Sequence, residues 1–266
     1  MDCVGVIGYG HMGRMLVNGF LTSGVLGLDE VVVSSRSRES RDACAAAWPR
    51  IGIAGTNREL ASRCRTIILA VRPQEIREVL REIVPILDGN EHIVSLAAGV
   101  DLGSLEALYP GPVTRVIPTI TSAVGQGTTL VCHGRRVETH DARRVEELFS
   151  SLGSVMPIRE EDLAAATLLS SCGPGLLAAI VEELAGAAAR ASGLTEDRAL
   201  LLTMGMVAAT AAYLRETGEA PGDLIGEVAT GGGVTEVGVK RLRERLPGVF
   251  DEAVGAMLDR CNTMGK

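Results

Sequence analysis

The feature that most constrains this chain is a glycine-rich turn within its first thirteen residues. An apolar run over Val4–Gly8 leads into Gly8–Gly13, which reads Gly-Tyr-Gly-His-Met-Gly, and a helical segment over Arg14–Leu21 follows at once. A GxGxxG pattern between a buried strand and a helix is typical of a dinucleotide-binding βαβ unit. This context favours that interpretation over the alternative, a glycine-rich turn with a purely structural role.

Each glycine of the turn has a separate task in such a unit. Gly8 permits the tight turn, Gly10 lets the backbone approach a pyrophosphate, and Gly13 lets the helix pack closely on the strand. The free N–H groups at the helix N-terminus then favour the anion. His11 and Met12 lie in the same loop. We expect His11 to border the phosphates rather than to catalyse, because the reacting carbon lies at the nicotinamide end.

The N-terminal part of the chain alternates short β-branched runs with amphipathic segments. Buried strands are predicted over Val4–Gly8, Val31–Ser35, Thr66–Val71, Ile93–Ala97 and Val113–Pro118. Helices are predicted between them, one opening with a capping-box pattern at Thr56 and the last covering Asp141–Leu152. This alternation predicts an α/β fold with a parallel, doubly wound sheet of the Rossmann type over residues 1–157.

After Pro157 the strand signal stops, and residues 158–266 are predicted to form an all-helical domain. Helices are expected over Asp162–Ser171, Leu176–Ala191, Thr195–Arg215 and Pro247–Cys261. The second and third are apolar on nearly every side, so they need cover on every side. We expect a second copy of the chain to supply it in a homodimer. The alternative is a self-contained helical bundle.

Composition excludes several classes of function. The chain has 266 residues, a net charge of −7 and only 3% aromatic residues, so it lacks the basic face and stacking platforms of a nucleic-acid binder. No run approaches the roughly 18 uninterrupted apolar residues of a membrane span, and the N-terminus lacks the features of a signal peptide. The six cysteines and four histidines are scattered. We therefore expect reduced cysteines, no metal site and a cytoplasmic protein.

The end of the second strand bears on cofactor choice. An NAD enzyme usually places a carboxylate there to bind the ribose 2′-hydroxyl. This chain instead has Ser34, Ser35 and Arg36, whose hydroxyl and guanidinium groups suit a 2′-phosphate. The sequence therefore predicts a preference for NADP(H). The alternative is a solvated loop that also accepts NAD(H).

Further segments fall where later strands of the sheet should end, which is the edge at which such sheets hold ligands. They are Ala70–Gln74, Ser95–Val100 and Arg115–Thr119. The helical part adds two more candidate segments, Leu169–Gly175 and Ala229–Thr235. We predict that the chemistry takes place among these segments.

In chain order, the motifs AVRPQ, SLAAGV, RVIP, SSCGPG, GEAPGDL and TGGGVT resemble those of the pyrroline-5-carboxylate reductase family over essentially the whole chain. The resemblance implies a Rossmann domain, a helical dimerisation domain and hydride transfer from NAD(P)H to a cyclic imine that carries a carboxylate, with proline as product. It also implies dimers that often assemble further into rings.

The resemblance implies roles for individual cofactor-binding residues as well. Ser34, Ser35, Arg36 and Asn57 would hold the adenosine end of the cofactor. The ribose and nicotinamide would be lined by Val71, Arg72, Pro73, Ala97 and Ala98.

The substrate carboxylate would be received by the loop Thr230–Thr235, on its backbone N–H groups. A glycine-rich turn before a helix forms an anion nest on physical grounds alone. The residues implied to bind substrate are Thr230, Gly232, Gly233, Val234 and Thr235. Thr235 matches the family threonine that hydrogen-bonds near the ring nitrogen of the substrate, so it is the predicted catalytic residue. Its alternative role is that of a helix N-cap.

Several departures from the family pattern fall in the site itself. The family's Asn-Thr-Pro is here Thr119-Ile120-Thr121, which removes a side-chain amide, and the loop proline is Gly231. An isoleucine of the family has become Glu236, a charge beside the predicted substrate loop. These changes leave the identity of the imine open.

Three other functions are therefore kept as hypotheses. One is a related imine reductase with a different substrate, and another is a non-catalytic NADP-binding regulatory paralogue. A β-hydroxyacid dehydrogenase would need an inward-facing lysine as acid and base. The chain offers only Lys240 and Lys266, and the ordinary interpretation of Lys240 is a solvated helix residue.

Overall fold

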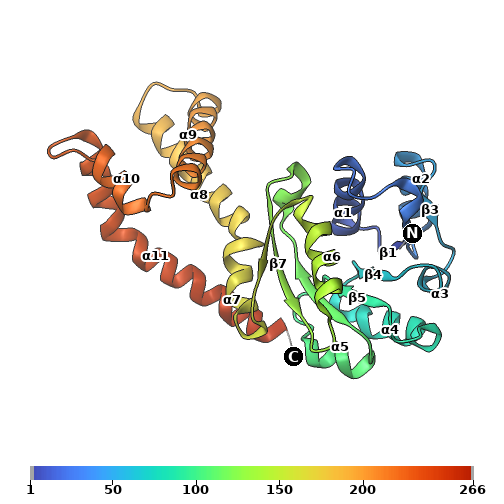
Figure 1. The fold of residues 1–266 in the computed structure, drawn as a ribbon. Helices are drawn as coiled ribbons and strands as arrows, with labels where there is room; N and C mark the ends of the chain where they lie inside the picture. The colour runs from blue at the N-terminus through green and yellow to red at the C-terminus, as the bar shows by residue number, and fades with distance from the viewer. Residues whose placement is uncertain (1–2, 265–266) are drawn as a thin grey trace. The chain divides into compact units, whose positions relative to one another are not determined.

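The computed structural model describes residues 3–264, which form two compact units. Gly173–Arg260 make up the second unit, and the remaining described residues make up the first. The first unit contains a single eight-stranded sheet with strand order β3-β2-β1-β4-β5-β6-β7-β8 (Figure 1). The strands are β1 (Val4–Ile7), β2 (Val31–Ser34), β3 (Gly52–Ile53), β4 (Thr66–Leu69), β5 (His92–Ser95), β6 (Val113–Ile117), β7 (Gly127–His133) and β8 (Gly153–Pro157).

The order of the first six strands is that of a Rossmann sheet, in which the strand order reverses between the parallel neighbours β1 and β4. All five predicted strands are present, each within a few residues of its predicted bounds. The sheet is not wholly parallel as predicted, since β7 runs antiparallel to β6. Only residues 118–126 join these two strands, too few for the crossover that a parallel pair needs. Strands β3, β7 and β8 were not predicted.

The core has two layers, because alternate residues of each strand face opposite sides of the sheet. One layer packs against α3 (Asn57–Ala61), α4 (Pro73–Ile83) and α5 (Leu102–Leu108), with Leu163 of α7 (Glu160–Ser170) joining it. The other packs against α1 (His11–Thr22), α2 (Arg38–Ala47) and α6 (Thr139–Ser150). In Figure 1, α4 and α5 accordingly lie on the other side of the sheet from α1. This three-layer arrangement leaves the carboxyl ends of β1, β2 and β4 open at one edge.

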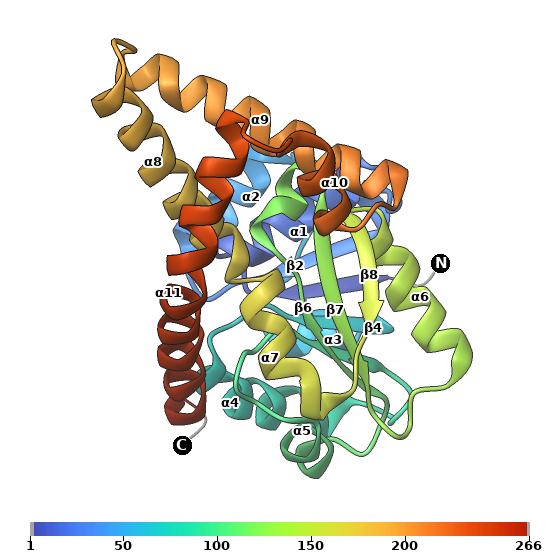
Figure 2. The same ribbon diagram turned by 90° about the vertical axis from the view of Figure 1, so that its left-hand side faces the viewer.

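The second unit is helical and leaves most of its side chains exposed. It consists of α8 (Gly173–Ala191), α9 (Glu196–Thr217), α10 (Pro221–Val228) and most of α11 (Val234–Met264), and α8 packs on α9 (Figure 2). Of its described residues only Ala185, Ala199 and Thr203 are buried. A self-contained bundle would bury a continuous apolar stripe on each helix, so that alternative is wrong for this unit.

Helix α11 corrects one prediction. It begins at Val234 and runs for 31 residues with Pro247 in its interior, whereas the sequence predicted that a helix begins at Pro247. Proline is favoured at the first position of a helix, and this preference misplaced the start. An interior proline removes a single backbone hydrogen bond, and a helix this long retains many others.

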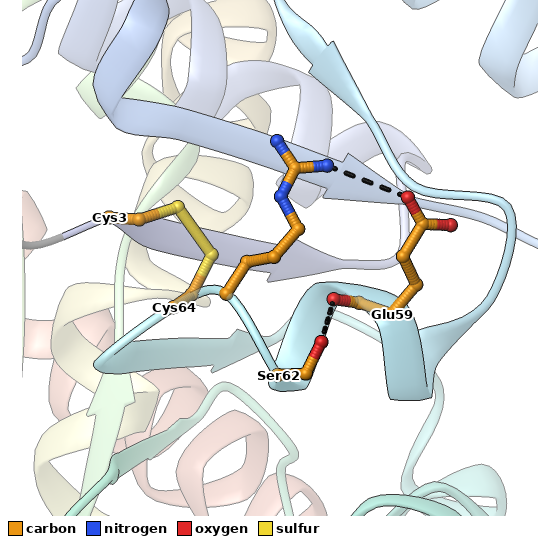
Figure 3. Close-up of a disulfide and its surroundings, with 5 residues drawn as sticks. Cys3, Glu59, Ser62 and Cys64 are labelled. Atoms are coloured by element: carbon orange, nitrogen blue, oxygen red, sulfur yellow. Dashed lines mark hydrogen bonds and ion pairs between the residues drawn. A yellow bond between two sulfur atoms is a disulfide. The ribbon is translucent and has the colours of Figure 1, made fainter.

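A second correction concerns the cysteines. Cys3 and Cys64 are joined by a disulfide, so the prediction of six reduced cysteines is wrong for this pair (Figure 3). Cys3 precedes β1 and Cys64 precedes β4, and these neighbouring parallel strands bring the two Cα atoms to 4.5 Å. The adjacent α3 turn is held by Ser62, which donates to the Glu59 carbonyl. The other four cysteines are free, as predicted.

The boundary between the two units lies further along the chain than the predicted domain boundary. Contacts divide the chain between Cys172 and Gly173, so that α7 belongs with the sheet. The predicted boundary between residues 157 and 158 instead follows the change from strands to helices. The helical stretch Glu160–Ala191 contains an 18-residue window of mean hydropathy 1.7, so it could cross a membrane by length and composition alone. One such stretch is weak evidence for a membrane span, since helices of a soluble protein pass the same test.

Candidate functional site

The glycine-rich turn lies at the carboxyl end of β1, in the centre of the sheet. Gly8 has φ +103°, a conformation that side chains rarely allow, and its N–H donates to the Ser34 carbonyl at 2.8 Å. A Cβ on Gly13 would lie 2.0 Å from the Gly8 carbonyl oxygen, whereas a Cβ on Gly10 would meet nothing within 4 Å. The turn is therefore closed toward α1 and open toward solvent at Gly10, where a pyrophosphate would approach.

The N-terminus of α1 is available for an anion. Gly10 is its N-cap and makes no side-chain capping hydrogen bond to the first turn of the helix. His11, the first residue of α1, is exposed, and Met12 is half-buried. This uncapped, open helix start fits the phosphates of a dinucleotide on geometry alone.

Tyr9 anchors the glycine-rich turn in the core through its buried side chain, a role that was not predicted from the sequence. Its side chain is buried beside Cys44 of α2, and the Arg14 guanidinium lies 5.6 Å from its ring centroid. Burial, reinforced by Cys44, raises the Tyr9 pKa to about 12, so the phenol stays neutral. Only its place between two glycines could have pointed to it, and that place is equally compatible with an exposed tyrosine.

A cavity of about 320 Å³ lies at this edge of the sheet. It brings together half of the predicted cofactor-binding residues: Gly8, Gly10, Ser35, Arg36, Asn57, Val71 and Arg72. The other half lies outside its lining: His11, Met12, Gly13, Ser34, Pro73, Ala97 and Ala98. The cavity therefore lies between the glycine-rich turn and the segments that follow β2 and β4, and segments after β5 do not line it.

A chain of hydrogen bonds anchors the floor of this cavity. The buried Ser34 hydroxyl donates to Asn57 Oδ1 at 2.7 Å, and Asn57 Nδ2 donates to Glu82 Oε2 at 2.7 Å. The loop after β2 is held by Arg41, whose guanidinium donates to the carbonyls of Ser35 and Arg36. Ser34 thus lies behind the cavity wall, while Ser35 and Arg36 line the cavity.

Three carboxylates of α4 line the same cavity, and the sequence analysis missed all of them. They are Glu75, Glu78 and Glu82, spaced three and four residues apart on one face of the helix. That spacing was visible in the sequence, but only the packing of α4 against α3 shows which ligand site this face borders. Glu75 pairs with Arg36 and with Arg72.

The segments after β5 and β6 are ordered by local hydrogen bonds. Ala97 is buried and donates its N–H to Ser95 Oγ at 3.3 Å, whereas Ala98 is exposed. Thr119 Oγ1 lies 2.7 Å from Thr121 Oγ1 and accepts from the Thr128 N–H at 3.2 Å. Thr119 therefore closes the turn between β6 and β7, in the place of the amide side chain of the family pattern.

In the second unit, the loop Thr230–Thr235 leads directly into α11. Gly232 has φ +78°, and its N–H donates to the Glu236 carboxylate at 2.7 Å. The Gly233 N–H donates to the Thr230 carbonyl at 2.8 Å. One N–H group of the predicted anion nest is thus already bonded to a carboxylate of this chain.

Thr235 is the second residue of α11 and is exposed, so it does not occupy the N-cap position that its alternative role requires. Lys240 is also exposed on α11, beside Glu236 and Glu244 in a shallow hollow that α10 borders. This is the setting of a solvated helix residue rather than of a buried acid–base lysine. Within residues 3–264, no three His, Cys, Asp or Glu side chains gather closely enough to hold a metal ion.

Comparison with known proteins identifies the family. Residues 160–264 match the family model described as pyrroline-5-carboxylate reductase dimerisation. The chain is 34% identical over 253 residues to pyrroline-5-carboxylate reductase 3 of Bacillus subtilis, covering 95% of this chain and 93% of that protein. It is 32% identical to pyrroline-5-carboxylate reductase of Corynebacterium melassecola, and 100% of both chains is covered. The chain belongs to the pyrroline-5-carboxylate reductase family.

Further matches agree with this assignment. Residues 3–99 match the family model described as NADP oxidoreductase, coenzyme F420-dependent. The structure of a pyrroline-5-carboxylate reductase from Coxiella burnetii superposes with a TM-score of 0.92 at 28% identity, covering 100% of this chain and 99% of that one. The predictions of an oxidoreductase, of NADP(H) as its cofactor and of a Rossmann domain followed by a helical dimerisation domain are thereby confirmed. The dimerisation match also supports an oligomer.

Proposed function

We propose that this protein reduces 1-pyrroline-5-carboxylate to L-proline with NADPH. The observation that carries the proposal is the match over nearly the full length to two pyrroline-5-carboxylate reductases. The chain also keeps a glycine-rich turn before α1 and another before α11. NADPH supplies a hydride to the imine carbon, and a proton on the ring nitrogen completes the amine. The protein's own task is to hold and align the two reactants.

The cofactor residues divide by the group that each would hold. The Gly8–Gly13 turn and the uncapped start of α1 would bind the pyrophosphate, with His11 and Met12 beside it. Ser35 and Arg36 would hold the 2′-phosphate on the adenosine ribose. Ser34 and Asn57 would stabilise that region through the hydrogen bond between their side chains. The ribose and nicotinamide would lie along Val71, Arg72, Pro73, Ala97 and Ala98.

The substrate residues would act through backbone N–H groups and hydroxyls. Thr230, Gly232, Gly233 and Val234 would receive the carboxylate, and the exposed Thr235 hydroxyl would bond near the ring nitrogen. A protonated imine already carries the positive charge that attracts a hydride, so no strong acid is needed.

We propose that the protein works as a homodimer or a multiple of it in the cytoplasm, and that residues 158–266 act together in substrate binding and dimerisation although α7 packs with the sheet. The exposed leucines and methionines of α8 and α9 support association, because their apolar area lacks cover within one chain. They include Leu177, Leu184, Leu201, Leu202 and Met204.

Replacing Thr235 tests the proposed chemistry. We expect Thr235→Val to lower turnover about 10- to 100-fold, as for loss of a hydrogen bond to a charged group, with NADPH affinity unchanged. Thr235→Ser keeps the hydroxyl and should be mild. Melting temperature, NADPH affinity and turnover are measured on each variant. Full activity in a folded Thr235→Val protein would exclude this residue from the mechanism.

A related imine reductase is the second candidate, and one contact favours it. Glu236 occupies the Gly232 N–H that a substrate carboxylate would use, which favours an imine without a carboxylate. Parallel assays with 1-pyrroline-5-carboxylate and with unsubstituted 1-pyrroline separate the two functions. NADPH binding without turnover of any cyclic imine would instead indicate a regulatory paralogue.

A further inference from the structure

Within this cavity a carboxylate lies between two arginine side chains. Glu75 Oε1 accepts from Arg72 Nη2 at 3.0 Å and is also contacted by Arg36 Nη2. Glu75 Oε2 accepts from the backbone N–H of Arg72 at 3.1 Å. One carboxylate thus pairs with both guanidinium groups that line the cavity.

The carboxylate is held more firmly than its partners. Glu75 is the third residue of α4, and its bond to the Arg72 N–H is the return half of a capping box. Its side chain is 15% exposed, against 71% for Arg36 and 78% for Arg72. The two arginines therefore have freedom to reorient toward a ligand, whereas Glu75 is tied to the helix start.

A 2′-phosphate and a 2′-hydroxyl would meet this arrangement differently. A phosphate is an anion that needs Arg36, so it competes with Glu75 for the same guanidinium and is repelled by the remaining carboxylate. A ribose hydroxyl can donate a hydrogen bond to a carboxylate, which is how NAD-binding sites use an acidic residue at this end of the cofactor.

We propose that Glu75 sets the preference of this protein between NADPH and NADH. By engaging Arg36 and Arg72 it lowers the affinity for NADPH, and by offering an acceptor to the ribose it sustains the affinity for NADH. This inference rests on one part of the proposed function, the use of a nicotinamide dinucleotide as cofactor. It concerns the binding of that cofactor and not the turnover of an imine.

The test is a titration of both cofactors against four proteins: the wild type, Glu75→Gln, Glu78→Gln and Arg36→Ala. Glu75→Gln keeps an oxygen that can accept from the Arg72 N–H, and its melting temperature is measured alongside. We expect it to tighten NADPH binding about 5-fold and to weaken NADH binding about 3-fold, the scale of exposed charge interactions. Glu78→Gln removes the same charge from the same cavity and should shift both cofactors equally.

Arg36→Ala should weaken NADPH far more than NADH, because it removes the phosphate partner itself. Binding of 2′,5′-ADP and 5′-AMP is compared in the same way to exclude effects at the nicotinamide end. Equal shifts of NADPH and NADH in Glu75→Gln would overturn the proposal. Weaker NADPH binding in that variant would overturn it too, because Glu75 would then serve to orient Arg36.

The outcome is separable from that of the proposed function. A wild-type protein that binds both cofactors but reduces no imine fails the proposed function and leaves the Glu75 titration fully informative. A wild-type protein that binds neither cofactor overturns the inference directly.

Discussion

The two glycine-rich turns of this protein are alike in sequence and different in construction. Both lead into a helix, and both contain a glycine with positive φ, Gly8 in the first and Gly232 in the second. At Gly13 an added Cβ would collide with backbone, whereas at Gly231 it would meet nothing within 4 Å. The start of α1 is uncapped, but Gly232 in the second turn is already bonded to Glu236.

The contrast shows that the conformation of a glycine-rich turn can be fixed in two ways. The first turn is fixed by packing against a core, so its shape is determined within one unit. The second is fixed by backbone conformation and by contacts within itself and the first turn of α11. The same difference holds for the two units, since the first has a two-layer core and the second buries only three of its described residues.

Alanine substitutions give the largest expected difference between the turns. Gly13→Ala places a methyl 2.0 Å from the Gly8 carbonyl oxygen, and we expect it to lower the free energy of unfolding by about 3 kcal/mol or more. Gly231→Ala, with open space around it, should change that free energy by less than about 0.5 kcal/mol. Urea unfolding of both variants measures the two effects.

Similar stabilities for the two variants would show that α1 can move away from β1 at little cost. The distinction between a packed turn and a free one would then be lost. NADPH affinity measured on the same samples shows whether the cofactor site follows the fold.

The next largest expected effect is a loss of folding stability at acid pH, and it arises in the first unit, which contains the two-layer core. His92 on β5 is buried, and its Nε2 lies 2.8 Å from Thr114 Oγ1. Burial, the largest cause, lowers the His92 pKa from 6.5 to about 4, with nearby His133 and His140 adding to it and Asp141 opposing it. The folded protein therefore keeps this imidazole neutral over a range in which the unfolded chain binds a proton.

Stability should accordingly be independent of this group above pH 6.5. As pH falls from 6.5 toward 4, the free energy of unfolding should fall by about 1.4 kcal/mol per pH unit, because only the unfolded state takes up the proton. His92→Gln does not titrate and should flatten the profile over this range, while exposed His140→Gln should not. Urea midpoints measured from pH 4.5 to 7.5 check this, and parallel profiles for wild type and His92→Gln would contradict it.

The smallest expected effect concerns the second turn. Glu236→Ala frees the Gly232 N–H and removes a charge beside the proposed carboxylate site, so the KM for 1-pyrroline-5-carboxylate should fall about 3- to 10-fold with little change in kcat. Glu244→Ala, further along α11 and paired with Arg241, is the matched control. A raised KM in Glu236→Ala would mean that the carboxylate helps to shape the turn for substrate.

Much of the cofactor side could be predicted from the sequence because its determinants are local. The GxGxxG turn, the strands of the parallel sheet and the missing carboxylate after β2 each depend on residues close together in the chain. Motif order alone led to the family. The substrate loop was predicted in the same way, and both its role and those of its residues stay predictions.

What the tertiary structure decided are contacts between residues distant in sequence. The pairing of Glu75 with Arg36 spans 39 positions, and the disulfide joins cysteines 61 positions apart. Neither has a local signal, because each depends on how neighbouring strands and α4 are placed. The hydrogen bond from Gly232 to Glu236 is local, yet it could not be predicted from the sequence either. It depends on a conformation of the Glu236 side chain that only the folded turn selects. Local periodicity determines which elements form, and packing decides which charges meet.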